Sequence, residues 1–188
     1  DKSFTISIIQ VAPGVDTGDI LMEKTFQINI SDTIVELHKI ANNQFPLLLL
    51  DVLDNINNGT IEPKKQDCQK TSYYPLRFPD DGFVLFDQMI AEEIHNRIRA
   101  LTTPYPGVTT YYQNKKIKIL KSSLTSRPYF GEPGRIYRIS KTKGILVCAK
   151  DRCLWLSDVI DIKTEKDCID TFSRYDKMAT IKEAAEIL

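Results

Sequence analysis

The chain has little of what metal sites and membrane segments require. Among its 188 residues are only two histidines, one tryptophan and four cysteines, and no two cysteines form a Cys-x-x-Cys pair. A structural zinc site needs Cys and His ligands at short spacings, so the sequence predicts no metal centre. The longest apolar run, residues 45–50, contains a proline. It is far shorter than the ~18 residues of a membrane span, so we expect no membrane contact.

Signals for secretion are also missing. The first residue is Asp1, and no basic segment with an apolar stretch behind it follows. We therefore expect a cytoplasmic protein whose cysteines stay reduced. Because residues 4–12 already have the composition of a strand, we also expect the chain to be part of something longer.

Charge balances over the whole chain but not along it. Residues 106–155 hold 11 Lys or Arg and 2 Asp or Glu, a net charge of +9, whereas residues 1–105 carry −6 and residues 156–188 carry −3. A block this basic is typical of a surface that binds phosphates, but an ordinary solvated surface can have the same composition. Charge alone leaves both interpretations open.

The first hundred residues predict a mixed α/β structure. Residues 4–12 and 20–30 have strand-like patterns, and a helical stripe begins at residue 34 and continues to residue 57. Thr33 and Glu36 have the spacing of a capping box, and Pro46 is expected to kink or divide the helix. A short strand at 83–86 and a helix at 88–101 are predicted next.

The pattern changes after residue 107. Five short β-rich segments separated by turns predict a small barrel or sandwich, and they lie at residues 108–113, 116–121, 135–140, 144–149 and 152–156. Residues 164–188 have a polar, helical pattern. We therefore place a domain boundary near residue 104.

The stretch that suggests chemistry follows the first strand. Asp16 lies between Gly14 and Gly18, and α/β sheets place their active sites where strands end. Glycines there let the backbone turn tightly and approach a ligand. Spacing alone, however, fits an aspartate that merely caps a turn.

Three motifs together resemble the formyltransferases that use 10-formyltetrahydrofolate, a family acting on methionyl-tRNA, glycinamide ribonucleotide or amino-sugar nucleotides. Residues 15–20 (VDTGDI) are similar to the family's Asp-x-Gly loop. Residues 91–107, a helix ending in Pro-Tyr-Pro-Gly, resemble the hinge into its C-terminal domain, and residues 131–134 (GEPG) resemble a turn inside that domain. The resemblance implies the C-terminal half of a Rossmann-like catalytic domain at residues 1–104. A small OB-like β-barrel with a polar helical tail is implied at residues 105–188.

The resemblance also implies functional residues. Asp16 matches the catalytic aspartate, and the backbone of the loop before it would bind the pterin of 10-formyltetrahydrofolate through Ala12, Pro13, Gly14 and Val15. The family's asparagine and histidine have no counterpart in this chain, and His38 and His95 lie on predicted helices where neither is expected to replace them. We therefore expect an N-formyltransferase whose activity this chain alone lacks.

Two details of the sequence favour an amino-sugar nucleotide as the acceptor, linked to UDP or dTDP. Three residues, 101–103, precede Pro104, and residues 77–83 resemble a stretch of the sugar branch. The +9 segment instead suits initiator methionyl-tRNA, which is the alternative. A non-catalytic barrel that binds nucleic acid, a non-catalytic partner subunit and a homodimer also stay open. The barrel tyrosines, expected to be half-buried strand residues, are Tyr111, Tyr112, Tyr129 and Tyr137.

Overall fold

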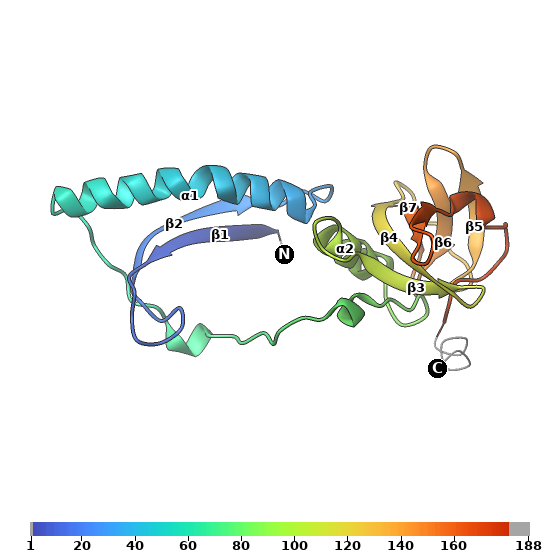
Figure 1. The fold of residues 1–188 in the computed structure, drawn as a ribbon, viewed down its shortest axis with the longest axis horizontal. Helices are drawn as coiled ribbons and strands as arrows, with labels where there is room; N and C mark the ends of the chain where they lie inside the picture. The colour runs from blue at the N-terminus through green and yellow to red at the C-terminus, as the bar shows by residue number, and fades with distance from the viewer. Residues whose placement is uncertain (1, 181–188) are drawn as a thin grey trace. The chain divides into compact units, whose positions relative to one another are not determined.

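The computed structural model describes residues 2–180 and divides the chain into two compact units (Figure 1). Unit 1 comprises residues 1–76 and unit 2 residues 77–188. Both combine helices with strands, so the predicted mixed α/β class is confirmed. Neither helix in the described part of the chain has the length and apolar composition needed to cross a membrane.

Unit 1 is a hairpin covered by one long helix. Strands β1 (Ser3–Ile9) and β2 (Ile20–Gln27) pair antiparallel, with Phe4 opposite Phe26. Helix α1 (Ile34–Asn57) lies along both strands (Figure 1). Because the two strands are antiparallel, unit 1 contains no parallel βαβ unit in its described residues, and the Rossmann-like assignment stays a prediction.

The start of α1 is as the sequence predicts, but its middle is not. Thr33 Oγ1 accepts a hydrogen bond from Val35 N at 3.2 Å, and Glu36 Oε2 accepts one from Thr33 N at 2.7 Å, which completes the capping box. The expected division at Pro46 is wrong, since α1 runs through it unbroken. Proline removes only one backbone donor, and the leucines that follow it are good helix formers.

Unit 1 buries few apolar side chains. Only Ile6, Leu48 and Val52 are buried among the apolar residues that the structure describes there. Leu48 and Val52 are four residues apart and therefore share one face of α1. Along the rest of α1, large apolar side chains are exposed at Val35, Phe45, Leu47, Leu49, Leu50, Leu53 and Ile56.

Unit 2 is built on one antiparallel sheet whose strand order is β3-β4-β7-β6-β5, with β8 paired to β7. The strands are β3 (Val108–Tyr112), β4 (Lys115–Leu124), β5 (Ile136–Ser140), β6 (Gly144–Cys148), β7 (Cys153–Asp161) and β8 (Lys166–Asp167). One face of this sheet and helix α2 (Ala91–Leu101) enclose the main core, with Phe86, Ile98, Ile119 and Leu154 all fully buried. The predicted strands are therefore present, and β4 and β7 are longer than expected.

Helix α2 is anchored to the sheet at its first turn. Asp151, in the turn between β6 and β7, accepts a hydrogen bond from Ala91 N at 2.7 Å. A carboxylate at a helix N-terminus satisfies a free N–H group and interacts favourably with the helix dipole. Helix α2 also packs on β4, and the compact units divide at residue 76, before α2. The domain boundary expected near residue 104 stays a prediction.

Two predicted elements of unit 2 are wrong. Residues 83–86 form no strand, because only an isolated bridge between Phe83 and Thr109 is present. Residues 164–180 are not a helical tail but contain β8, a 3-10 turn at Ile169–Thr171 and an extended segment. The rest of that predicted tail, 181–188, lies outside the described residues. Short 3-10 turns also occur at Cys68–Lys70 and Pro79–Gly82.

The expected OB-like barrel is not seen as a closed barrel. The sheet path ends at β3 and β5, so two edges stay open. Residues 175–179, here called the strap, bond to both edges. At one edge Tyr175 N donates to Ile136 O at 2.7 Å, and Ile136 N donates to Asp176 O at 2.9 Å. At the other edge Ala179 N donates to Tyr111 O at 2.9 Å. An extended segment with isolated bridges therefore links the two edges of the sheet.

Candidate functional site

The sequence-predicted site is the loop between β1 and β2, residues 10–19. This loop closes the hairpin of unit 1 through the hydrogen bond from Gln10 N to Asp19 O at 2.9 Å. It brings Ala12, Pro13, Gly14, Val15 and Asp16 into one continuous turn, so all five predicted site residues lie together.

One glycine and one distant glutamine fix the shape of the loop. A Cβ atom at Gly18 would lie 1.6 Å from Gln10 O, so no larger residue fits beneath this turn. Gln66 Nε2 donates hydrogen bonds to Asp16 O at 2.8 Å and Gly18 O at 2.6 Å. Sequence reasoning missed Gln66, because no local pattern links it to a loop nearly fifty residues earlier.

Asp16 has an unusual backbone conformation. Its φ is 53°, in the left-handed region that aspartate adopts more readily than most side chains. The residue is exposed, and its carboxylate has no hydrogen-bond or ion-pair partner among residues 2–180. The carboxylate is therefore available to a ligand or substrate.

The loop also offers unused backbone groups beside apolar side chains. Within the described chain, no peptide group of residues 11–13 forms a hydrogen bond, and Val15 and Asp16 lie in the turn that follows. Val11 and Val15 are 95% and 90% exposed, which is unusual for valine. Free peptide donors and acceptors flanked by apolar side chains fit a planar heterocycle that carries polar edges. The residues predicted to hold the pterin thus have the chemistry that such a ring needs.

Neither histidine is positioned in this loop. His95 lies on α2 in unit 2, where it is 5% exposed, and its Nδ1 is 2.8 Å from Ser122 Oγ. His38 lies on α1. Their places on helices agree with the expectation that neither replaces the family's catalytic histidine, which stays a prediction.

Cysteines and metal-ligating side chains form no second centre in the described residues. No group of three or more His, Cys, Asp or Glu side chains there could hold a metal ion. The four cysteines are free thiols. Burial raises the pKa of Cys148 and Cys153, and it raises that of Cys168 to about 11. Such thiols are poor nucleophiles at neutral pH.

The two other motifs are structural parts of unit 2. Gly134, at the end of the 131–134 turn, has a φ of 79°, and a Cβ atom there would lie 2.8 Å from Met178 O of the strap. The hinge after α2 is closed by a hydrogen bond from Gly107 N to Leu101 O at 2.8 Å. These motifs shape the start of the sheet and its junction with the strap.

Comparison with known protein families matches residues 78–171 to the family described as the formyl transferase C-terminal domain. The chain belongs to the formyltransferase family. A methionyl-tRNA formyltransferase of Clostridium novyi is 38% identical over 147 residues, which are 78% of this chain and 46% of that protein. One of Caldicellulosiruptor saccharolyticus is 35% identical over 161 residues, 84% of this chain and 50% of that protein. The formyltransferase chain thus spans about half the length of these curated relatives.

Two solved structures share the fold. An N-formyltransferase of Helicobacter canadensis, solved with folinic acid and dTDP-3-aminofucose, matches with a TM-score of 0.66 at 23% identity, over 84% of this chain and 56% of that one. HypX of Aquifex aeolicus with tetrahydrofolic acid matches with a TM-score of 0.64 at 15% identity, over 95% and 34%. At these identities the likeness concerns the fold alone.

Proposed function

We propose that this chain is part of an enzyme that transfers a formyl group from 10-formyltetrahydrofolate to the amine of methionyl-tRNA. The observation that carries the proposal is the loop of residues 10–19, in which an exposed, unpaired Asp16 lies beside free peptide groups. The residues of this loop match the family's Asp-x-Gly motif. Relatives at 38% and 35% identity named for this reaction support the family's chemistry for the whole protein.

Each part of the loop has a role in this proposal. The bound donor supplies the formyl carbon. Peptide groups of residues 12–15 hydrogen-bond the edge of its ring, and Val11 and Val15 cover the ring from water. The negative charge of the Asp16 carboxylate favours a protonated catalytic neighbour. This carboxylate would accept the proton that the attacking amine loses and pass it to the donor nitrogen, which is released when its bond to the formyl carbon breaks. Gln66 is a positioning residue, because it holds the two carbonyls on either side of Thr17.

Asp16→Asn tests the loop. In the complete enzyme this change keeps the shape of the side chain but removes its charge, so turnover should fall by about two orders of magnitude or more while folate binding stays close to normal. Asp51→Asn, at an exposed position of α1, is the matched control and should leave turnover unchanged. Near-normal turnover of Asp16→Asn would refute the assignment and would favour a non-catalytic role.

The choice of methionyl-tRNA as the acceptor rests on the charge of this chain and on the relatives it resembles. The sequence placed an amino-sugar nucleotide first, whereas the two relatives above are named for methionyl-tRNA. The +9 segment, residues 106–155, forms much of unit 2 and suits a polyanion. Both observations favour tRNA.

A salt series separates the acceptors. Each phosphate contact releases counterions, so tRNA binding to the complete enzyme should weaken about tenfold or more as salt rises severalfold. An amino-sugar nucleotide carries two phosphates and should show a shallow slope. Formylation assays with methionyl-tRNA and with UDP- and dTDP-linked amino sugars give the decision. If binding depends only weakly on salt and only a sugar nucleotide is formylated, the amino-sugar nucleotide becomes the proposed acceptor and methionyl-tRNA the alternative.

The sugar acceptor remains the second candidate because of one specific feature. Three residues, Leu101 to Thr103, separate the motif from Pro104. Leu101 ends α2, and the turn that follows is closed by a hydrogen bond from Tyr105 N to Thr102 O at 3.0 Å. This longer hinge resembles that of the sugar branch. The Helicobacter canadensis enzyme, solved with dTDP-3-aminofucose, has the same fold.

A further inference from the structure

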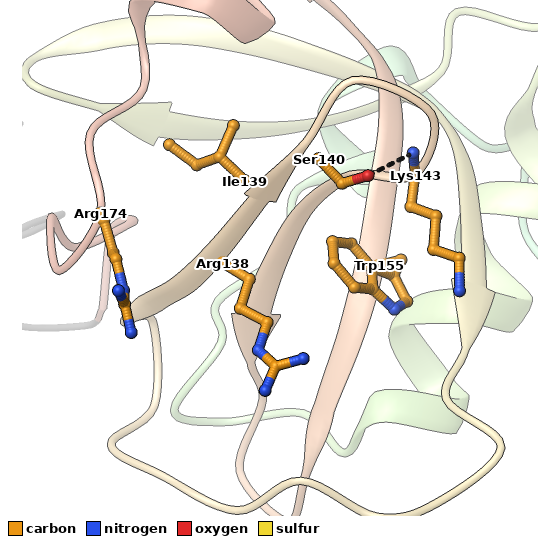
Figure 2. Close-up of a pocket in the computed structure, with 6 residues that line it drawn as sticks. All are labelled: Arg138, Ile139, Ser140, Lys143, Trp155 and Arg174. Atoms are coloured by element: carbon orange, nitrogen blue, oxygen red, sulfur yellow. Dashed lines mark hydrogen bonds between the residues drawn. The ribbon is translucent and has the colours of Figure 1, made fainter.

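An open pocket of about 520 Å³ lies on unit 2, on a part of the sheet that the proposed chemistry does not use. Figure 2 shows its lining, which comes from β5, the β5–β6 turn, β7 and the segment after the last 3-10 turn. The residues are Arg138, Ile139, Ser140, Lys143, Trp155 and Arg174. The predicted loop of residues 10–19 belongs to unit 1 and contributes nothing to this pocket.

The charge of the lining has one sign. Three of the six residues, Arg138, Lys143 and Arg174, are cationic, and no acidic residue lines the pocket. None of the three forms an ion pair within residues 2–180. Cations gathered in a hollow without acidic partners create a positive potential that attracts anions. Phosphate is well suited, because arginine can bind two of its oxygens at once.

The cations are held in place by the fold. Arg174 Nε donates to Tyr137 O at 3.0 Å, which fixes this side chain against β5. Ser140 Oγ accepts from the backbone N of Thr142 and of Lys143, each at 3.3 Å, which orders the turn that carries Lys143 (Figure 2). The Arg138 guanidinium lies 5.3 Å from the Tyr129 ring centroid. A site ordered in advance loses less entropy on binding.

An aromatic platform lies beside these cations. Trp155 is partly exposed and packs on a second apolar cluster, formed on the opposite face of the sheet from the main core by Tyr137, Leu146, Cys148 and Cys153. Lys143 Nζ lies over the indole, 5.8 Å from its centroid. Leu146 pairs with Trp155 on one side and with Arg138 on the other. Arg138 on β5 and Trp155 on β7 therefore lie at equivalent positions of the sheet, with Leu146 of β6 between them.

We propose that this pocket binds a nucleotide, with its base stacked on Trp155 and its phosphate held by Arg138, Lys143 and Arg174. Stacking on an aromatic face combined with basic groups that hold the backbone is how proteins bind unpaired nucleotides. The exposed Lys143 chain moves from the indole to the phosphate when the base arrives. A neutral sugar would leave three cations unpaired, and an acidic peptide would make no use of the aromatic face.

The chain provides its own reporter for this site. Trp155 is the single tryptophan of the 188 residues, so a stacked base should quench the intrinsic fluorescence of the chain. Titration with UMP and AMP should give saturable quenching, and inorganic phosphate at equal concentration should give little. If phosphate competes as well as a nucleotide, or if nucleotides cause no saturable quenching, the proposal is wrong.

Two lysine variants decide whether the pocket is responsible. Lys143→Ala should weaken nucleotide binding about tenfold, the usual effect of losing one charged contact to phosphate. Lys115→Ala is the matched control, because Lys115 is also exposed and follows the β3–β4 turn, at the far end of β4 from the residue that pairs with Trp155. Equal weakening by both variants would show a diffuse charge effect and overturn the proposal. Calorimetry with Trp155→Ala, which has no fluorophore, should show a similar loss.

A separate experiment distinguishes a free nucleotide from a strand of nucleic acid as the ligand. A short single-stranded RNA that binds more tightly than UMP, and loses that affinity in Lys143→Ala, identifies a strand of nucleic acid as the ligand. Equal affinity for UMP and for the RNA identifies a free nucleotide. Both readouts measure binding, so they stand even if no formyl transfer is found. Conversely, formylation by the complete enzyme, together with no saturable quenching of the unchanged chain by nucleotides, would reject this site alone.

Discussion

Units 1 and 2 use their apolar residues in different ways. Unit 2 encloses a main core of 19 buried residues between its sheet and α2, whereas unit 1 buries only three apolar residues among those described. Helix α1 nevertheless carries more large apolar side chains than it can place against two strands. Unit 2 is therefore stabilised by its own core, and unit 1 presents apolar surface of the kind that proteins normally cover.

Separating the units should produce the largest effect. Residues 77–188 expressed alone should unfold in one cooperative thermal transition, because the main core lies within that segment. Residues 1–76 alone should show no such transition, since a two-stranded sheet with one helix buries too little to be stable. Circular dichroism during heating measures both. A sharp transition of the 1–76 segment would remove the difference between the units.

Matched leucine substitutions test the same difference one residue at a time. Leu154, on β7, is 0% exposed, whereas Leu50 on α1 is 58% exposed. Leu154→Ala should lower the free energy of unfolding of unit 2 by about 2–5 kcal/mol, and Leu50→Ala should change stability by less than about 0.5 kcal/mol. Denaturant titration provides the values. Similar losses in both variants would mean that the exposed face of α1 is in fact covered.

Alkaline pH should weaken unit 2. Burial, and then the hydrogen bond to Asp176, raise the pKa of Tyr112 to about 12 from its usual value of 10.0. A raised pKa stabilises the fold below pH 10 and loses that contribution as the pH rises towards 12. The melting temperature should therefore fall in this window, and Tyr112→Phe should show a smaller fall there. A fall of equal size in Tyr112→Phe would assign the effect to other groups.

Acid pH should weaken α1, and this is the smallest effect expected. Hydrogen bonds from the side chain and backbone of Thr33 lower the pKa of Glu36 below 4.5. A lowered pKa gives stability that is present above 4.5 and lost as the pH falls through the lower folded value. Helicity should decline slightly in that range, and less so in Thr33→Ala. An identical acid profile for both proteins would contradict the capping role.

Local patterns in the sequence predicted most elements correctly. The Thr33 and Glu36 capping box, the continuation of α1 to residue 57 and the five short strands after residue 107 depend on neighbouring residues, and the structure has all of them. Pro46 does not divide α1, because proline removes only one backbone donor and good helix formers follow it. The predicted strand at 83–86 has the composition of a strand but finds only one bridging partner.

Interactions distant in sequence were out of reach. The predicted site residues lie in one loop, as a local motif allows, but Gln66 holds that loop from outside the motif. The pocket around Trp155 gathers residues from positions 138 to 174, and composition showed only that this region is basic. The strap was taken for a helix because its partners, β3 and β5, are far away along the chain.

The strap described above also determines how unit 2 behaves towards other chains. An edge strand with free N–H and C=O groups recruits a strand from a neighbouring molecule and so starts aggregation. The strap occupies such groups on β5, while Val84 and Ala179 together occupy those of β3 at Thr109 and Tyr111. The sheet thus remains open in topology, and part of each edge is already occupied. We therefore expect variants that disrupt the strap to aggregate more readily than the unchanged chain.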